Sequence, residues 1–382
     1  MEQLSSTEIQ SIISNFDLHG RPGRIYPTGS GLINDTYRIE NLSSGYPDYL
    51  LQRINHRIFK NVQALMENIA EVTFHLRKKL KDRQVEGVEN KVLTLVPSKN
   101  GLYYCKDEFG NYWRMYLFIP DTRSYDLVET EQQAFEGGRA FGSFQSMLSD
   151  LDVSRISDSI PDFHNIEKRL KDLDLALLSD PAGRKKEVEE EIRFIDLRRE
   201  IMCSILELGR KGRLPLRIIH SDTKFNNVLL DKNDHVQCVI DLDTVMPGFV
   251  AYDFGDAIRT IINTAAEDEK DAAKIQLNIP LFSAYASGYF LETKDFLTAE
   301  EVHSLMKGVI LMPYMQAVRF LTDYVQGDIY YKTSFTGHNL QRTRAQITLV
   351  KRLEENRADL EKIITGEALK QNPSLLVNAQ TA

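Results

Sequence analysis

The sequence predicts an α+β protein with two lobes, a small β-rich N-terminal lobe and a larger, mainly helical C-terminal lobe. Segments with alternating apolar residues crowd into the first 120 residues around one long helix pattern. From about Thr130 onward, apolar residues recur at helical spacing, and Pro120 follows the last apolar strand. We therefore expect lobes over residues 1–119 and 120–366, with a flexible tail over 367–382.

Composition excludes several classes of protein. The 382 residues are 42% hydrophobic and 27% charged, as in an ordinary globular protein. A net charge of -8 argues against a dedicated nucleic-acid surface, which would be basic. No signal peptide or transmembrane run is found, and three scattered cysteines fit a reduced compartment. We therefore expect a cytoplasmic protein with neither nucleic-acid nor membrane partners.

The N-terminal lobe should begin with a short helix that ends near Phe16. A glycine loop over 28–34 then leads into an alternating strand over 36–39, and a second strand, YLLQRIN, follows the turn NLSSGYPD. An amphipathic helix is predicted over 62–80. Two further strand segments, KVLTLVPS and GLYYCKDEFGNYWRMYLFI, complete the predicted sheet, with a turn near Phe109 and Gly110 in the second.

The C-terminal lobe should start with a helix over 132–151, in spite of its glycines. The charged segment over 165–211 predicts two antiparallel helices with a break at 180–183. A helical region is predicted again over 299–364.

Polar residues interrupt an apolar context in IIHSDTKFNNVLL. The strands over 228–230 and 237–240 predict a hairpin, which would bring Asn227 near Asp241, and these oxygen donors suit Mg²⁺. Asp222 lies on the preceding loop, where its carboxylate could orient an attacking hydroxyl. Any one of these residues is explained by a polar turn, but the joint arrangement is typical of phosphoryl transfer.

The pattern HxDxxxxN, followed by a hairpin and a hydrophobic residue before Asp241, resembles the aminoglycoside phosphotransferase and choline kinase superfamily, which has a protein-kinase-like fold. The segments HSDTKFNN, IDLDTVMPG, DFGDAIR and RFLTDYVQGDIYY are similar, more narrowly, to the N-acetylhexosamine 1-kinases. The resemblance implies that ATP and Mg²⁺ are used to phosphorylate the anomeric hydroxyl of GlcNAc or GalNAc. The first lobe would then bind nucleotide, and the second would carry the catalytic and substrate-binding residues.

The resemblance also implies roles for the residues of the catalytic loop. Asp222 would be the catalytic base, and His220 would support its loop. Asn227 and Asp241 would hold Mg²⁺, with Asp243 as a further ligand or a residue behind the ligands. Lys224 would either approach the transferred phosphate or be solvated, and the sequence leaves both options open.

For the nucleotide, the resemblance implies contacts from the glycine loop, the second strand of the hairpin and the hinge. On the second strand, Gln52 stands where a protein kinase has a lysine, and the adjacent Arg53 should face the other side of the sheet. The candidate nucleotide-binding residues are Gly29, Ser30, Gly31, Asn34, Gln52, Tyr116, Phe118 and Ile119.

For the sugar, the implied contacts lie in the helical lobe. Arg319 and Asp323 are four residues apart, so a simple ion pair would also explain them, and Arg259 could face a structural acid. The candidate substrate-binding residues are Asp222, Arg259, Arg319, Asp323 and Tyr330.

Rival interpretations stay open on the acceptor. The same fold could act on choline, homoserine, another sugar or an aminoglycoside, and a kinase-like protein could bind nucleotide without catalysis. The presence of Asp222, Asn227 and Asp241 together argues against the non-catalytic alternative. The sequence does not decide between GlcNAc and GalNAc, or between a monomer and an oligomer.

Overall fold

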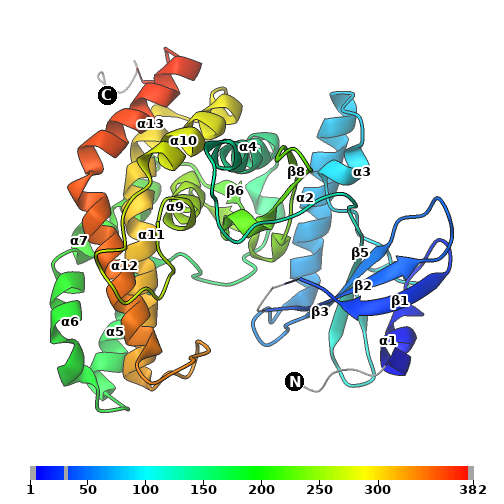
Figure 1. Ribbon diagram of the computed structural model, residues 1–382, viewed down its shortest axis with the longest axis horizontal. Helices are drawn as coiled ribbons and strands as arrows, with labels where there is room; N and C mark the ends of the chain where they lie inside the picture. Colours follow the sequence, from blue (N-terminus) through cyan, green and yellow to red (C-terminus); the bar gives the residue numbers. More distant parts are fainter. Residues whose placement is uncertain (1–5, 30–32, 377–382) are drawn as a thin grey trace. The chain divides into compact units, whose positions relative to one another are not determined.

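The computed structural model describes residues 6–29 and 33–376, and it divides the chain into two compact units. The first unit contains Met1–Ser124, Asp150–Pro161 and Leu229–Met246. The second contains Tyr125–Ser149, Asp162–Val228 and Pro247–Ala382. The predicted α+β class is confirmed, with a β-rich unit at the N-terminus and a second, mostly helical unit (Figure 1).

The first unit is built on a five-stranded antiparallel sheet with the strand order β1-β2-β3-β5-β4. Its strands are β1 (Pro22–Pro27), β2 (Asp35–Asn41), β3 (Tyr49–Ile54), β4 (Cys105–Lys106) and β5 (Tyr112–Leu117). The predicted helices are found as α1 (Ser6–Ile13) and α2 (Val62–Asp82), and the short helix α3 (Val88–Lys91) follows. Later segments of the chain add η1 (Val153–Arg155), β8 (Val236–Val239) and η4 (Leu242–Thr244).

Alternation along the strands divides the sheet into two different faces. One face packs Ile39, Leu51 and Met115 against the apolar side of α1. Since neighbouring residues of a strand point to opposite sides, Gln52 and Arg114 lie on the other face. The sheet therefore separates an apolar core on one face from polar side chains, including the buried Arg114, on the other.

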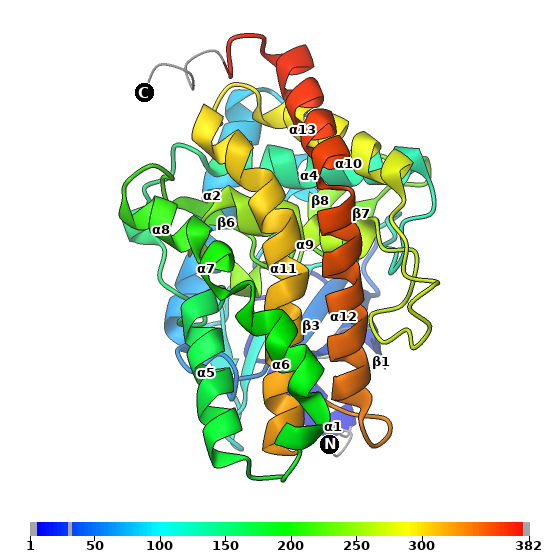
Figure 2. The same ribbon diagram turned by 90° about the vertical axis from the view of Figure 1, so that its left-hand side faces the viewer.

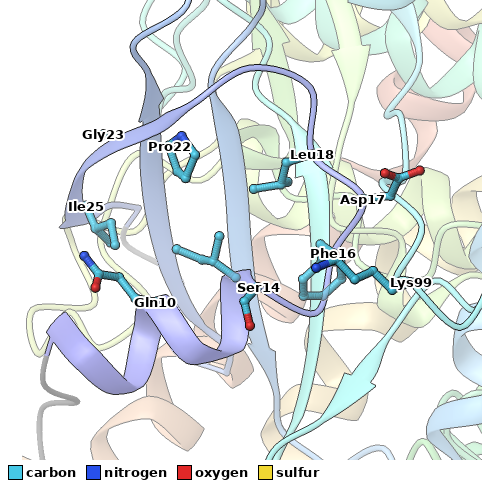
Figure 3. A pocket seen from close by; sticks show the side chains of 10 residues that line it. Gln10, Ser14, Phe16, Asp17, Leu18, Pro22, Gly23, Ile25 and Lys99 are labelled. Carbon is cyan, nitrogen blue, oxygen red and sulfur yellow. The ribbon is translucent and has the colours of Figure 1, made fainter.

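A cavity of about 370 Å³ lies on the α1 side of this sheet. Figure 3 shows that Gln10 of α1 and Ser14, the residue after α1, line it together with Pro22 and Ile25 of β1. It is separated by the sheet from the face that carries Gln52 and Arg114. We therefore do not include it in the candidate site.

The second unit is a helical assembly with one small sheet. Its helices are α4 (Glu131–Leu148), α5 (Ile166–Ser179), η2 (Lys185–Val188), α6 (Glu189–Asp196), α7 (Arg199–Met202), α8 (Ser204–Arg210), η3 (Phe225–Asn227), α9 (Val250–Ile261), α10 (Ile279–Thr293), α11 (Ala299–Gln326), α12 (His338–Glu355) and α13 (Arg357–Gln371). Strand β6 (Arg217–Ile219) pairs with β9 (Met246–Gly248). In the first unit, β8 pairs with β7 (Val228–Leu230), which begins at the last residue of the preceding second-unit segment. Figure 2 shows α11 and α12 side by side, with α5 and α6 next to them.

Three segments differ from the elements predicted for them. Residues 22–27, for which no strand was predicted, form the edge strand β1. The predicted strand over 91–98 does not form a continuous strand. It makes only isolated bridges, such as that between Leu95 and Tyr116 of β5. Beyond residue 183 the expected single helix is divided into η2, α6, α7 and α8, and no proline marks these breaks.

Within the described ranges, no helix combines the length and the apolar character needed to span a membrane.

Candidate active site

The loop between β6 and η3 in the second unit is fixed by Asp253, a buried residue of α9. The backbone N–H groups of His220 and Ser221 each donate to one carboxylate oxygen of Asp253, at 2.8 Å. The Gln145 side chain also donates to Asp253, at 2.8 Å. Burial raises the pKa of Asp253, and these hydrogen bonds favour the carboxylate. The loop is thus anchored by bonds to a charged group, which are among the stronger hydrogen bonds in proteins.

His220 supports the loop from its buried side. The side chain is fully buried, and its ring lies edge-on to Phe141 at 5.6 Å and to Phe144 at 5.7 Å between centroids. Its Nδ1 accepts a hydrogen bond from the backbone N–H of Asp222 at 3.3 Å. Since the ring has these contacts within the fold, His220 can orient the backbone at Asp222 without reaching a substrate.

Asp222, Lys224 and Asn227 are brought together around one carboxylate. The Lys224 ammonium lies 3.1 Å from Asp222 Oδ2, and Asn227 Nδ2 lies 3.3 Å from the same oxygen. Asn227 Nδ2 also donates to the backbone carbonyl of Asp222 at 2.8 Å. Because both side-chain contacts use Oδ2, the second oxygen of Asp222 can serve as a proton acceptor. The partly exposed carboxylate is therefore held in one orientation.

A second group of charges lies behind the loop, around Asp256 of α9. Asp256 accepts from the backbone N–H of Thr223 at 3.1 Å and pairs with Arg259 at 2.9 Å. Burial by itself raises the pKa of Asp256, but Arg259, His164 and Lys224 outweigh burial and hold this pKa below its usual value. Burial likewise lowers the pKa of Lys224, while Asp222 and Asp256 more than compensate and leave it raised. The lysine thus stays charged beside Asp222.

Arg259 faces acids of its own unit. Besides Asp256, it pairs with Glu267 at 3.0 Å. Of the two roles considered for Arg259, the structure places its guanidinium with structural carboxylates.

Arg319 and the end of α11 form a separate aromatic and polar group. The Arg319 guanidinium lies 5.7 Å from the ring centre of Phe163 and 5.6 Å from that of Tyr331, and it donates to Gln316 at 3.1 Å. Burial lowers the pKa of His164, which adjoins Phe163, to about 3 and keeps its imidazole neutral. The Tyr331 hydroxyl is buried, and among the described residues it has no hydrogen-bond partner.

Asp323 organises the segment that follows α11. It accepts from the backbone N–H groups of Tyr330 at 2.7 Å and Tyr331 at 2.9 Å, and from Asn339 Nδ2 at 2.8 Å. These bonds fix the two tyrosines, whose rings lie 4.8 Å apart between centroids. Tyr330 is 66% exposed, so its ring is open to a ligand.

In the first unit, the polar face of the sheet carries a connected set of side chains. Gln52 donates to Thr36 at 3.1 Å, and its carbonyl oxygen accepts from Arg114 Nε at 2.9 Å. Arg114 also pairs with Asp243, which accepts from Asn34 Nδ2 at 2.7 Å. Gln52 is thus on the predicted face, whereas Arg53 pairs with Asp35 on the opposite face.

The remaining candidate nucleotide contacts also lie in the first unit, except that Ser30 and Gly31 are outside the described residues. Gly29 has a φ of +81°, a left-handed conformation that favours glycine. Tyr116 and Ile119 are buried, and the Phe118 ring lies 4.0 Å from the guanidinium carbon of Arg38.

The donor set fits Mg²⁺ rather than a metal held wholly by protein. Asn227 directs its amide nitrogen to Asp222, so its carbonyl oxygen is the atom left for a cation. Over residues 6–29 and 33–376, no group of three His, Cys, Asp or Glu side chains has the arrangement of a metal site. Mg²⁺ needs no such group, because it is commonly bound through one or two protein oxygens together with substrate phosphates.

Sequence reasoning missed two residues that organise these groups. Arg114 lies in the strand YWRMYL, and a charged residue in an apolar strand is the signal that could have indicated it. Asp253 lies in the segment DFGDAIR and binds the loop 32 and 33 residues upstream. That contact depends on tertiary packing, which no local pattern reveals.

Comparison with known proteins gives matches to a family model and to solved structures. Residues 25–291, more than half of the chain, match the model of the phosphotransferase enzyme family. Similar solved structures include a microcompartment-associated aminopropanol kinase, with 16% identity, a TM-score of 0.60, and coverage of 94% of this chain and 99% of the other. A choline kinase from Cryptosporidium parvum has 14% identity, a TM-score of 0.54 and coverage of 93% of both chains.

A spectinomycin phosphotransferase in complex with ADP and spectinomycin has 11% identity, a TM-score of 0.53, and coverage of 96% of this chain and 99% of the other. At these identities the structural likeness concerns the fold, and it confirms the predicted protein-kinase-like class. Because the family match spans both the sheet of the first unit and the loop around Asp222, the chain belongs to the phosphotransferase enzyme family.

Proposed function

We propose that this protein is an ATP- and Mg²⁺-dependent kinase that phosphorylates the anomeric C1 hydroxyl of an N-acetylhexosamine. The observation that carries the proposal is the position of Asp222, whose carboxylate is oriented by Lys224 and Asn227 on a loop fixed to α9. Phosphoryl transfer depends mainly on such positioning and on charge neutralisation.

In this proposal Asp222 orients the sugar hydroxyl and accepts its proton while the hydroxyl attacks the terminal phosphate in line. Lys224 keeps a positive charge beside that carboxylate and can approach the transferred phosphate. Asn227 and Asp241 hold Mg²⁺, which when bound neutralises phosphate charge. No covalent phospho-enzyme is required, because the hydroxyl attacks the phosphate directly.

The acceptor assignment depends on the resemblance of RFLTDYVQGDIYY and on the surroundings of Arg319. Burial and the positive charge of Arg319 lower the pKa of Arg169. Within the described part of the chain, neither arginine has a carboxylate ion pair. Two arginines without carboxylate ion pairs disfavour a cationic acceptor and favour a neutral one with carbonyl and hydroxyl oxygens. Arg319 and Tyr330 would then bind the acetamido group and ring hydroxyls, with Asp323 holding the tyrosine in place.

The alternative is a kinase of the same fold with another acceptor, such as choline, homoserine, another sugar or an aminoglycoside. The compared structures include an aminopropanol kinase, a choline kinase and a spectinomycin phosphotransferase, so the fold accommodates varied acceptors. A non-catalytic nucleotide-binding protein is a further alternative, and the oriented carboxylate of Asp222 argues against it.

The test is an ADP-release assay with ATP and Mg²⁺ on GlcNAc, GalNAc, glucose, choline, aminopropanol, homoserine and kanamycin. We expect turnover with at least one N-acetylhexosamine and a kcat/KM at least tenfold higher than with any amine. Turnover with an amine alone would contradict the acceptor assignment while leaving the kinase activity in place. ATP binding without turnover on any acceptor would support the non-catalytic alternative.

A further inference from the structure

Arg114 is a buried cation in the middle of an apolar strand. It is 1% exposed, and its neighbours Trp113 and Met115 are fully buried. Burying a guanidinium is costly unless its charge is paired and its N–H groups find acceptors. The partners of Arg114 therefore indicate what its position requires.

Those partners connect the sheet to Asp243, in η4. Arg114 Nη1 pairs with Asp243 Oδ1, while its Nε donates to Gln52 on the neighbouring strand at 2.9 Å. The other carboxylate oxygen, Oδ2, accepts from Asn34 Nδ2 at 2.7 Å. Asn34 in turn accepts from the backbone N–H of Asn55 at 3.0 Å. Both oxygens of the buried Asp243 are thus engaged within the first unit.

Asp243 lies two residues after Asp241, at the turn into η4. Asp241 has a φ of +59°, in the left-handed region that non-glycine residues rarely adopt. Such a conformation is unfavourable by itself and persists when its surroundings hold it. A carboxylate anchored at Oδ1 and Oδ2 two residues later provides such a hold.

We infer that Arg114, the buried cation that contacts Gln52, is a positioning residue and not a phosphate ligand. With Asn34, it holds Asp243 as the anchor of the turn, so that Asp241 and not Asp243 is the carboxylate offered to the metal. The inference is based on the proposed Mg²⁺-dependent function. Ligation by Asp243 would require a metal to compete with a buried guanidinium for the same charge.

The test measures Mn²⁺ binding to the full chain in the presence of ADP, by electron paramagnetic resonance of free Mn²⁺. Asp241→Asn should weaken Mn²⁺ binding at least tenfold, whereas Asp243→Asn should change it by less than about threefold with unchanged stoichiometry. Asp35→Asn, which removes the partner of Arg53 on the opposite face, serves as the matched control and should have no effect. Loss of Mn²⁺ binding in Asp243→Asn equal to that in Asp241→Asn would overturn the assignment.

A second comparison keeps the result independent of folding defects. Replacing the pair together, as Arg114→Met/Asp243→Leu, leaves no unpaired buried charge. We expect this double variant to bind Mn²⁺ about three- to tenfold more weakly than the wild type with unchanged stoichiometry, because the turn loses its anchor while the ligand Asp241 remains. Arg114→Lys, which keeps the charge, should weaken binding less. Wild-type affinity in the folded double variant would overturn the anchoring role, and a loss as large as that in Asp241→Asn would overturn the assignment of Asp241 as the ligand. A wild type that binds ADP but no Mn²⁺ would refute the proposed function itself.

Discussion

Asp253 shows how a single buried carboxylate can determine the shape of a catalytic loop. Its two oxygens accept from two successive backbone N–H groups, those of His220 and Ser221. Ser221 has a φ of +66°, so the loop is held in an unfavourable conformation there. An asparagine at position 253 would offer one oxygen and an NH₂ group, and one of the two backbone donors would lose its acceptor.

We predict that Asp253→Asn lowers kcat at least tenfold and reduces the free energy of unfolding by about 1 to 3 kcal/mol, the cost of a buried unsatisfied donor. Steady-state kinetics and urea unfolding would check this. Asp172→Asn, which removes a surface i,i+4 ion pair with Lys168, is the control and should change stability by less than about 0.5 kcal/mol. Unchanged kinetics in Asp253→Asn would contradict the anchoring role.

His164 predicts a specific dependence of stability on pH. Its pKa is lowered from 6.5 to about 3 by burial, so the unfolded chain binds this proton more tightly than the folded chain. This group therefore does not reduce the free energy of unfolding above pH 6.5. As the pH falls from 6.5 toward 3, it lowers that free energy by at most about 1.4 kcal/mol per pH unit. Urea unfolding of His164→Asn between pH 7 and 5 should show a shallower loss than the wild type. If the free energies of unfolding of the variant and the wild type fall in parallel with pH, His164 is not buried in its neutral form.

At the scale of elements, glycines set how closely the helices of the second unit approach. A Cβ at Gly308 of α11 would lie 1.9 Å from the carbonyl oxygen of Ala251 in α9. A Cβ at Gly138 of α4 would similarly lie 2.1 Å from the carbonyl oxygen of Tyr285 in α10. Because α9 also carries Asp253 and Asp256, which bind the catalytic loop, the contact between α9 and α11 helps to fix the position of that loop.

We predict that Gly308→Ala destabilises the protein by about 1 to 3 kcal/mol, since the helices must separate to admit the methyl group. The midpoint temperature of thermal unfolding and kcat should both decrease. We expect the decrease in kcat because a displacement of α9 moves the catalytic loop that it anchors. Gly366→Ala, in α13, is the matched control, because a Cβ there meets no atom within 4 Å. That variant should be neutral or stabilised by up to about 1 kcal/mol. Equal effects of the two substitutions would refute the packing argument.

The elements differ in how far the sequence predicts them. Strong apolar periodicity gives α2 and α4, and the loop around Asp222 follows from its motif. The division of the segment after residue 183 into α6, α7 and α8 could not be predicted, because no glycine or proline separates these helices. The role of Arg114 depends on cross-strand register and on Asp243, 129 residues away, which local patterns do not encode.

At the scale of the whole molecule, the first unit takes its residues from three separate segments of the chain. The segment Leu229–Met246 brings Asp241 and Asp243 into the unit that also holds the glycine loop and Gln52. The following residues return to the second unit. Asp241 and Asp243 are therefore grouped with the candidate nucleotide residues by tertiary structure and not by sequence order, whereas Asn227 belongs to the second unit.

We predict that saturating Mg²⁺ and ADP stabilise the full chain against unfolding by about 2.7 kcal/mol at a ligand concentration of 100 Kd. Asp241→Asn should abolish the part of this increment that requires Mg²⁺ and retain the part due to ADP alone. Differential scanning calorimetry with ADP, with and without Mg²⁺, separates the two. An increment in Asp241→Asn that responds to Mg²⁺ as in the wild type would exclude Asp241 as a ligand.

The most direct test is phosphorus NMR of the product formed from ATP, Mg²⁺ and GlcNAc or GalNAc by the wild type and by Asp222→Asn. We predict a sugar 1-phosphate resonance with the wild type and a rate about 10²- to 10⁴-fold lower in the variant, as expected for loss of a general base. ADP affinity should be nearly unchanged in the variant. Phosphorylation at another hydroxyl, or equal rates for the two proteins, would contradict the account.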